Sequence, residues 1–302
     1  MPTVHANGID IRYEVLGPGG QTPLVLTHGF AGPVDNWLPE LAPLIEKRAV
    51  IMYDVRGHGR TTVPLDPDAY SLPTFADDLS SLLRAIGVER AHIGGVSMGG
   101  MITAQFAVDH PELCESVLLC DTTCGNASTA LSTGASAPLS TGAVSDGPAG
   151  DWERRMAVGI SALAHMAQEC GLEETIRREQ AFKLENDPHL DESPYTFEGD
   201  FERIKLMTVP GYLGAAHAIS TRPDLTARIR SIAAPTLIMA GEWDDLLPCA
   251  LRDHALIPNS RVVVRQRCAH GSGWRPETFV SEILGFLADV EAGRPVTGKR
   301  EV

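Results

Sequence analysis

The stretch that decides the fold is Ala91-His92-Ile93-Gly94-Gly95-Val96-Ser97-Met98-Gly99-Gly100. It opens with an apolar run typical of a buried strand, and a helix-like run follows from Met98. Its centre matches the pattern G-x-S-x-G, which is a modest signal alone and could be a glycine-rich turn with an incidental serine. Between a strand and a helix, however, the pattern predicts a sharp turn that presents the serine hydroxyl above the edge of a sheet. The glycines around Ser97 remove side chains that would clash with neighbouring backbone in such a turn.

Short apolar runs recur on both sides of this stretch and end at or near glycine, aspartate or proline. They are Leu24–Thr27, Ala49–Tyr53, His92–Val96, Val117–Cys120, Thr236–Ala240 and Val262–Arg265. Continuous apolar runs of this length fit strands that are buried on both faces of a parallel sheet. At the start of the chain, Ile9–Val15 alternates apolar and polar residues after a turn at Asn7-Gly8, which predicts a hairpin.

Helical patterns fall between these runs. Apolar residues repeat at helix spacing from Phe75 to Ile86, with Thr74 as a cap and Gly87 as a stop. Trp37–Ile45 and Met98–Val108 are further helical segments. The alternation of strands and helices predicts an α/β fold with a doubly wound, mostly parallel sheet.

The alternation stops between Thr122 and Arg230, where the patterns are helical. The expected helices are Asp151–Cys170, Leu172–Glu185, Phe201–Met207 and Tyr212–Ile219. We therefore interpret residues 122–230 as a helical cap inserted into a core formed by residues 1–121 and 231–302. Residues 125–150 are almost entirely small, which predicts a flexible loop that serves as a spacer or as the edge of a lid. The polar tail from Gly293 is expected to be frayed.

Composition narrows the classes of partner. The 302 residues carry a net charge of -14 and show no basic stripe, which argues against nucleic acid and anionic membranes as partners. The N-terminus does not resemble a secretory leader, and no run approaches the ~18 apolar residues of a membrane span, so we expect a cytoplasmic protein. The six cysteines form no C-x-x-C pair, which argues against zinc and dithiol sites. The sequence does not fix the oligomeric state, and a homodimer is one option.

The serine needs a base and an acid to become a nucleophile. Of ten histidines, His270 is the best candidate for the base because it follows the last predicted strand, at the edge where such sites assemble. Asp244 follows the preceding predicted strand and is our choice for the acid, with its neighbour Asp245 and the strand-end Asp121 as alternatives. The order Ser97, Asp244, His270 predicts a Ser–His–Asp triad.

Backbone N–H groups should bind the oxyanion that forms during acyl transfer. We expect these donors at Met98, directly after the serine, and at Phe30 in His28-Gly29-Phe30, after an earlier strand. One such donor contributes on the order of 3 kcal/mol in a comparable site. The stretch Tyr53–Arg60 also ends a strand; its Asp54 or His58 could be catalytic, but we favour a rigid turn with a local Asp–Arg pair.

Aromatic residues near these positions are candidates for the substrate pocket. Trp243 and Trp274 flank the predicted acid and base, and they form either a pocket wall or anchors for their loops. Trp152 and Tyr212 lie in the predicted cap, where they face the ligand or pack the cap helices together.

Together, His28-Gly29-Phe30, Tyr53–Arg60, Gly95–Gly100, Gly241–Asp244 and His270 resemble the α/β-hydrolase superfamily over essentially the whole core. Within it, the chain is most similar to the 3-oxoadipate enol-lactonase-like hydrolases, also in Gly211-Tyr212-Leu213 through Ala218-Ile219. The resemblance implies a Ser–His–Asp triad in a pocket between core and cap, without a metal or cofactor. Two departures, the long stretch 125–150 and Gly271-Ser272-Gly273-Trp274 after the histidine, lie at the predicted pocket mouth.

We therefore expect a serine hydrolase that cleaves a small ester or lactone through an acyl-enzyme, with a small-molecule acyl compound as its substrate. Two alternatives stay open at this point. The same triad could cleave a C–C bond or transfer an acyl group, and the pocket could serve a non-enzymatic receptor.

Overall fold

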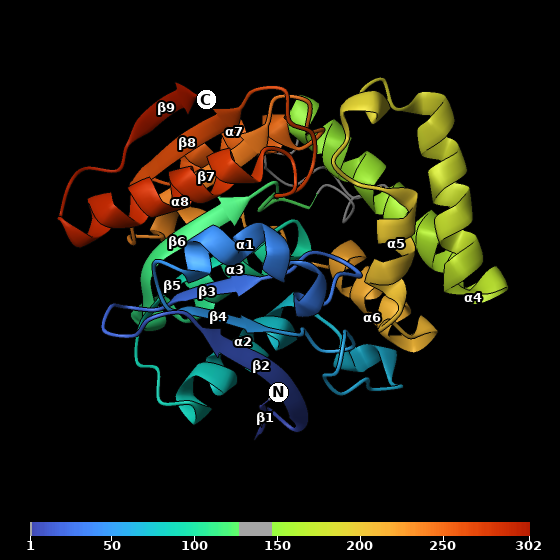
Figure 1. Cartoon of the computed structure of the whole chain (residues 1–302), viewed down its shortest axis with the longest axis horizontal. Coiled ribbons are helices and arrows are strands. Elements are labelled where there is room, and N and C mark those ends of the chain that lie inside the picture. Colours follow the sequence, from blue (N-terminus) through green and yellow to red (C-terminus); the bar gives the residue numbers. More distant parts are fainter. Residues whose placement is uncertain (1, 127–146) are drawn as a thin grey trace.

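The computed structural model describes residues 2–126 and 147–302, and a nine-stranded sheet runs through its centre (Figure 1). The strand order is β1-β2-β4-β3-β5-β6-β7-β8-β9. The strands are β1 (Thr3–Ala6), β2 (Ile9–Leu16), β3 (Leu24–Thr27), β4 (Val50–Tyr53), β5 (Ala91–Val96), β6 (Cys114–Cys120), β7 (Thr236–Gly241), β8 (Ser260–Arg265) and β9 (Gly298–Glu301). The pairs β1–β2 and β2–β4 are antiparallel and all other pairs are parallel, which confirms the predicted mostly parallel α/β sheet.

Helices cover both faces of the sheet. One face packs on α1 (Leu38–Ile45) and α8 (Pro276–Glu291); the other packs on α2 (Leu72–Ala85), α3 (Met98–Asp109) and α7 (Leu247–Leu256) (Figure 1). Successive strand residues point to opposite faces, so Val25 joins one hydrophobic cluster and Leu26 the other. Burial on both faces explains why the central strands read as continuous apolar runs.

Helix α2 begins earlier than the sequence predicted. Its N-cap is Ser71, whose hydroxyl accepts a hydrogen bond from the Thr74 N–H at 3.1 Å, so Thr74 lies inside the first turn. The helix therefore gains Leu72, and Pro73 stands in the first turn, where a missing N–H costs nothing.

The prediction of a frayed tail from Gly293 is wrong for the last residues. Gly298–Glu301 form β9, a parallel edge strand beside β8. The Val302 N–H donates to the Val264 carbonyl at 3.0 Å, and the Gln266 N–H donates to the Val302 carbonyl at 2.7 Å. These bonds join backbone groups, so the polar side chains of the tail gave no sign of them.

Among the described residues, three α-helices lie in the sequence between β6 and β7, and Figure 1 shows them together on one side of the molecule. They are α4 (Pro148–Asn186), α5 (Phe197–Ile204) and α6 (Val209–Ser220). Two of the predicted helices are merged in α4 across a kink at Gly171, whose φ of 81° departs from helical geometry. Helical structure in this part of the chain is as predicted, but α5 covers Phe197–Ile204 instead of Phe201–Met207, because the Thr196 hydroxyl caps the helix by accepting the Gly199 N–H.

The predicted flexible loop 125–150 falls for its greater part on residues 127–146, outside the described residues. Its described ends are ordered. Gly125 and Asn126 are buried, and the guanidinium of Arg222 donates to the Gly125 carbonyl at 2.7 Å. At the other end, α4 begins at Pro148.

A buried charged cluster joins α4 to the core. Glu153 of α4 is fully buried and accepts hydrogen bonds from the Thr123 hydroxyl and, at 2.8 Å, from Arg252 of α7. Because breaking a buried ion pair leaves an uncompensated charge, this cluster fixes the position of α4 on the core.

Candidate active site

The loops that follow five parallel strands meet at one edge of the sheet. The register pairs Thr27 with Gly95, Val96 with Cys120, and Gly241 with Arg265, so these strands end at similar heights. Parallel strands present their carboxyl ends at the same edge, where α/β proteins assemble their sites. All residues that we predicted for the triad and for the oxyanion donors belong to these loops.

Ser97 occupies the sharp turn between β5 and α3. Its backbone has φ 58° and ψ −119°, a conformation that non-glycine residues rarely adopt. The turn is held by the Ser97 N–H, which donates to the Cys120 carbonyl at 3.0 Å, and by the Thr122 hydroxyl, which donates to the Ser97 carbonyl at 2.8 Å. Strain of this kind persists only where the surroundings enforce it, and it is concentrated at functional sites.

The neighbouring glycines are required by close backbone contacts. A Cβ atom at Gly95 would lie 2.3 Å from the Gly99 carbonyl group, and one at Gly99 would lie 2.0 Å from the Thr27 carbonyl oxygen. The sequence interpretation that glycines make room for the turn therefore has a direct geometric basis.

His270 and Asp244 lie together across the ends of β8 and β7. The Nδ1 atom of His270 is 3.0 Å from the Oδ2 atom of Asp244. The other carboxylate oxygen of Asp244 accepts the Leu246 N–H at 2.9 Å, so both oxygens are engaged. The alternative acid Asp245 is exposed to solvent. The His270 side chain is 45% exposed, which leaves part of the ring accessible.

The contact between His270 and Asp244 shifts the pKa of both side chains. Burial alone would raise the pKa of Asp244, but the imidazolium charge of His270 and its hydrogen bond hold that pKa below its usual range. Burial would likewise lower the pKa of His270, but the carboxylates of Asp244 and then Asp121 raise it to about 9. At neutral pH the geometry therefore favours an ion pair between residues 244 and 270.

Asp121, our more distant alternative for the acid, binds backbone and arginine instead. Its Oδ2 accepts the Arg265 guanidinium at 2.7 Å and the Gly271 N–H at 3.2 Å, while its Oδ1 accepts the Gly241 N–H at 3.1 Å. Both charged side chains are fully buried. This ion pair links the ends of β6, β7 and β8, and it supports the loop that carries His270.

A buried histidine orients the loop after β3. The Val55 N–H donates to the Nε2 atom of His28 at 3.0 Å, so the proton is on Nδ1, which lies 2.8 Å from the Gly29 carbonyl oxygen. Because the C=O and N–H of a trans peptide point in opposite directions, fixing the Gly29 carbonyl also fixes the Phe30 N–H. Gly29 approaches the serine closely, since a Cβ atom there would lie 3.4 Å from the Ser97 Cβ.

His58, in the turn after β4, supports the same loop. The Ala31 N–H donates to its Nε2 atom at 3.3 Å. Burial lowers the pKa of His58 to about 3 and that of His28 to about 4, so both rings are neutral. The Asp54 carboxylate accepts the N–H groups of Val34 and Arg60 at 2.9 Å, which makes this stretch a rigid turn as we favoured, although the bond to Arg60 is to its backbone.

Comparison with known proteins places this arrangement in a family. The chain matches the model of the α/β-hydrolase fold over residues 22–275, a range that includes every strand end described above. The chain belongs to the α/β-hydrolase family.

Individual members of the α/β-hydrolase family are similar to this chain over most of their length. The chain is 27% identical to the putative carbamate hydrolase RutD of Azorhizobium caulinodans, over 96% of this chain and 100% of that protein. It is 23% identical to 3-oxoadipate enol-lactonase 2 of Acinetobacter baylyi, over 82% of this chain and 81% of that protein. The enol-lactonase structure from Burkholderia xenovorans superposes with a TM-score of 0.75 at 22% identity, covering 95% of this chain and 100% of the other. These likenesses confirm the predicted resemblance to enol-lactonases.

The four aromatic candidates of this α/β-hydrolase lie at different places. Tyr212 of α6 is buried, with its ring centroid 4.5 Å from that of Phe30. Trp243 meets Trp274 edge to face at 5.8 Å. Trp152 of α4 packs against a small cluster near α7. Tyr212 is therefore beside the predicted oxyanion loop, and Trp274 contacts Trp243, the neighbour of Asp244 in the chain.

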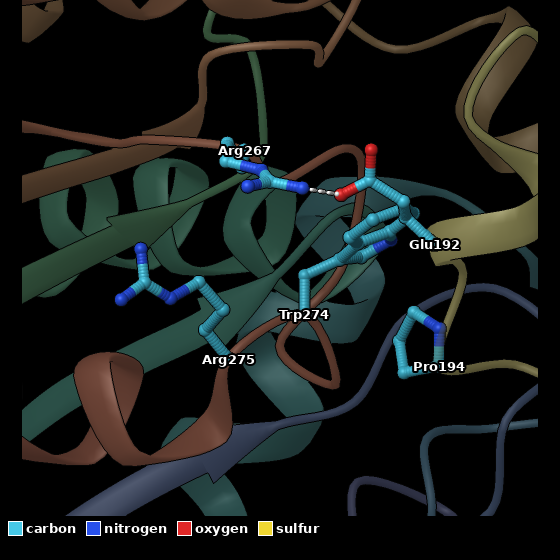
Figure 2. A pocket seen from close by; sticks show the side chains of 5 residues that line it. All are labelled: Glu192, Pro194, Arg267, Trp274 and Arg275. Atoms are coloured by element: carbon cyan, nitrogen blue, oxygen red, sulfur yellow. Dashed lines mark hydrogen bonds and ion pairs between the residues drawn. The ribbon is translucent and has the colours of Figure 1, made fainter.

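A cavity of about 340 Å³ is lined in part by the loop between β8 and α8 (Figure 2). Its lining residues are Glu192, Pro194, Arg267, Trp274 and Arg275. Figure 2 shows the carboxylate of Glu192 paired with the guanidinium of Arg267, with Trp274 beside them. One wall therefore comes from the connection between α4 and α5, and the other from the loop after β8.

The described residues contain no group of three or more His, Cys, Asp or Glu side chains arranged to hold a metal ion. No helix among them is long and apolar enough to cross a membrane.

Sequence reasoning missed several residues that support the site. The Asp121–Arg265 pair had one visible sign, since an arginine at the end of an apolar strand needs a buried partner. The roles of His28 and His58 depend on contacts between separate loops, and no spacing in the sequence indicates them.

Proposed function

We propose that this α/β-hydrolase is a serine hydrolase that cleaves a small ester or lactone, with Ser97 as nucleophile, His270 as base and Asp244 as acid. The observation that carries the proposal is the 3.0 Å contact between His270 Nδ1 and Asp244 Oδ2 at the sheet edge where the strained Ser97 turn also lies. In its neutral form, a histidine held through Nδ1 in this way can accept the serine proton on Nε2.

The proposed reaction has two halves. In the first, the Ser97 hydroxyl oxygen attacks the acyl carbon and its proton passes to His270 Nε2. The resulting oxyanion accepts the N–H groups of Phe30 and Met98, and His270 protonates the departing alcohol oxygen as the C–O bond breaks. In the second half, His270 takes a proton from water, the water oxygen attacks the acyl carbon, and the Ser97 oxygen leaves with that proton.

The local structure supports the two oxyanion donors. Met98 is the first residue of α3, and the N–H groups in the first turn of a helix have no partner within the helix. The Phe30 N–H is oriented through the bond between His28 and the Gly29 carbonyl. Both donors are therefore preorganised, so little reorganisation accompanies charge development.

The similarity to known hydrolases narrows the class of bond that we expect this enzyme to cleave. The relatives above are named for the hydrolysis of a carbamate and of an enol-lactone, and both bonds have an acyl carbon attached to a heteroatom. We propose the same bond class here. We also propose that residues 122–230 form a cap over the core, and that Trp152, Tyr212, Trp243 and Trp274 line the acyl pocket.

A panel of short-chain esters and lactones tests the proposal. Wild type should hydrolyse at least one compound, and Ser97→Ala should lower kcat by about 10⁴-fold or more while folding normally. The matched control is Ser281→Ala, which removes a hydroxyl from α8 on the outside of the core and should leave kcat unchanged.

Other outcomes of this panel identify other functions. Turnover of β-diketones without ester turnover, abolished by Ser97→Ala, would replace the proposal with C–C bond hydrolysis. Transfer of the acyl group to an added alcohol in preference to water would indicate an acyltransferase. Tight binding without turnover, unchanged in Ser97→Ala, would indicate a receptor.

A further inference from the structure

The loop that carries His270 is held by hydrogen bonds at nearly every residue after the histidine. The Gly271 N–H binds Asp121, and the carbonyl groups of Gly271 and Trp274 accept the Arg265 guanidinium at 3.1 Å and 2.8 Å. Arg265 ends β8 and Asp121 directly follows β6, so both partners belong to the core. These bonds hold part of the loop against the sheet.

Ser272 adds two further bonds to the core. Its hydroxyl accepts the Trp37 indole N–H at 2.8 Å and donates to the Glu40 carboxylate at 2.8 Å. Another backbone donor of the loop, the N–H of Gly273, has a partner from a different part of the chain.

That partner is Tyr195, which lies in the connection between α4 and α5. The Gly273 N–H donates to the Tyr195 hydroxyl oxygen at 3.1 Å. Gly273 is buried, so without this hydroxyl its N–H would lack a partner inside the protein, at a cost comparable to a lost hydrogen bond.

The ring of Tyr195 also fills the space beside the two glycines of the loop. A Cβ atom at Gly271 would lie 2.2 Å from the Tyr195 hydroxyl oxygen, and one at Gly273 would lie 3.0 Å from its ring. The Tyr195 ring therefore packs into the space that Gly271 and Gly273 leave open. This contact gives a physical reason for glycine at positions 271 and 273.

The same connection contacts the loop of the acid. The ring of His189 stacks on Trp243, next to Asp244, with centroids 3.6 Å apart and planes inclined by 2°. Glu192 pairs with Arg267 at the start of the histidine loop. Residues 189–195 thus contact the loops of both proposed triad partners, at three separate points.

We propose that Tyr195 is a positioning residue for His270. Through Tyr195, the packing of the α4–α5 connection against the histidine loop affects the position of the imidazole ring. The proposal rests on the proposed function, because it assigns His270 as the base. When the α4–α5 connection packs against the histidine loop, the Tyr195 hydroxyl accepts the Gly273 N–H and holds this peptide in place. When the α4–α5 connection moves away, the loop loses this hydrogen bond but keeps its hydrogen bonds to Asp121 and Arg265.

The test compares Tyr195→Phe with Tyr70→Phe in the full-length protein. Both variants lose one hydroxyl that bonds to backbone; the Tyr70 hydroxyl donates to the Pro64 carbonyl at 2.7 Å, away from the histidine loop. Three quantities are measured: the amide exchange rate of Gly273, the pH titration midpoint of the His270 ring by NMR, and kcat with KM for the best ester.

In Tyr195→Phe we expect Gly273 exchange to accelerate by about tenfold or more, because its N–H loses its acceptor. The His270 midpoint should fall by about half a pH unit or more, toward the ordinary value, since the loop no longer holds the ring as firmly against Asp244. At a pH above both midpoints, where the ring is neutral in both proteins, kcat should fall by about five- to tenfold with KM nearly unchanged. Tyr70→Phe should leave all three quantities as in wild type.

The proposal is overturned if Tyr195→Phe keeps the wild-type Gly273 exchange and His270 midpoint, or if both variants change them equally. These two readouts do not depend on turnover. Failure of the proposed function is seen separately, as the absence of ester hydrolysis by wild type.

Discussion

The Nδ1 atom of His270 lies 3.0 Å from the Oδ2 atom of Asp244, although 26 positions separate the two residues in the chain. The contact exists because β7 and β8 are adjacent parallel strands whose following loops emerge at the same edge. One oxygen of Asp244 binds the ring and the other binds the Leu246 N–H, so the carboxylate has a single orientation. The pair therefore behaves as one electrostatic unit in the predictions below.

We expect Asp244, and not its neighbour Asp245, to act as the acid of the triad. Asp244→Asn keeps the side-chain shape but removes the charge that stabilises the imidazolium, so kcat should fall by about 10³- to 10⁴-fold. The matched control is Asp245→Asn, one residue away and exposed, which should change kcat by less than about threefold. Ester kinetics of both variants measure this, and equal losses would contradict the assignment.

The rate should depend on pH through the His270 ring. The carboxylates of Asp244 and Asp121 outweigh the effect of burial and raise the pKa of His270 to about 9, so the ring of the free enzyme is protonated at neutral pH. Since only the neutral ring accepts the serine proton, kcat/KM should rise with pH, with a midpoint near pH 9, and level off only above it. Asp121→Asn should move this midpoint to lower pH, because it removes a nearby negative charge. A profile already flat at pH 7 would be inconsistent with this ion pair.

The glycines of the sharp turn around Ser97 should be important for the stability of the fold. A Cβ atom at Gly99 would lie 2.0 Å from the Thr27 carbonyl oxygen, so Gly99→Ala should lower the free energy of unfolding by about 2 kcal/mol or more. Gly159→Ala is the control, because its Cβ would meet nothing within 4 Å and α4 is helical there. That variant should stabilise the protein by about 0.5–1 kcal/mol. Denaturant unfolding of both proteins checks the contrast, and similar effects would argue against the close contact.

Much of the fold could be predicted because its signals are local. Strands buried on both faces produce continuous apolar runs, and the serine between β5 and α3 has glycines that the turn requires. The positions of Asp244 and His270 followed from the rule that loops after parallel strands share one edge. These inferences need only neighbouring residues and a general property of sheets.

Other features depend on contacts that leave no local pattern. Strand β9 is held by backbone bonds to β8, and its side chains are polar, so it looked like a loose tail. The hydroxyl of Tyr195 reaches Gly273 across 78 positions of sequence. Neither the distance in the chain nor the residue types around Tyr195 indicate this contact.

Buried neutral histidines should make the protein sensitive to acid. Burial lowers the pKa of His92 to about 4, below the value near 6.5 of an unfolded chain, so the unfolded state binds a proton that the folded state does not. Stability from this group is present above pH 6.5 and is lost as the pH falls toward 4. His92→Gln should reduce the slope of unfolding free energy against pH by about 1.4 kcal/mol per pH unit between these limits. Chemical denaturation across this pH range measures the slope, and an unchanged slope would contradict the prediction.

The central claim is that Ser97 is a nucleophile activated by His270, and the rate and position of labelling by a fluorophosphonate measure it most directly. The account predicts one label per chain on the peptide that contains Ser97, no label in Ser97→Ala, and labelling slower by about 10³-fold or more in folded His270→Ala. A label on another residue, or an unchanged rate in His270→Ala, would contradict it.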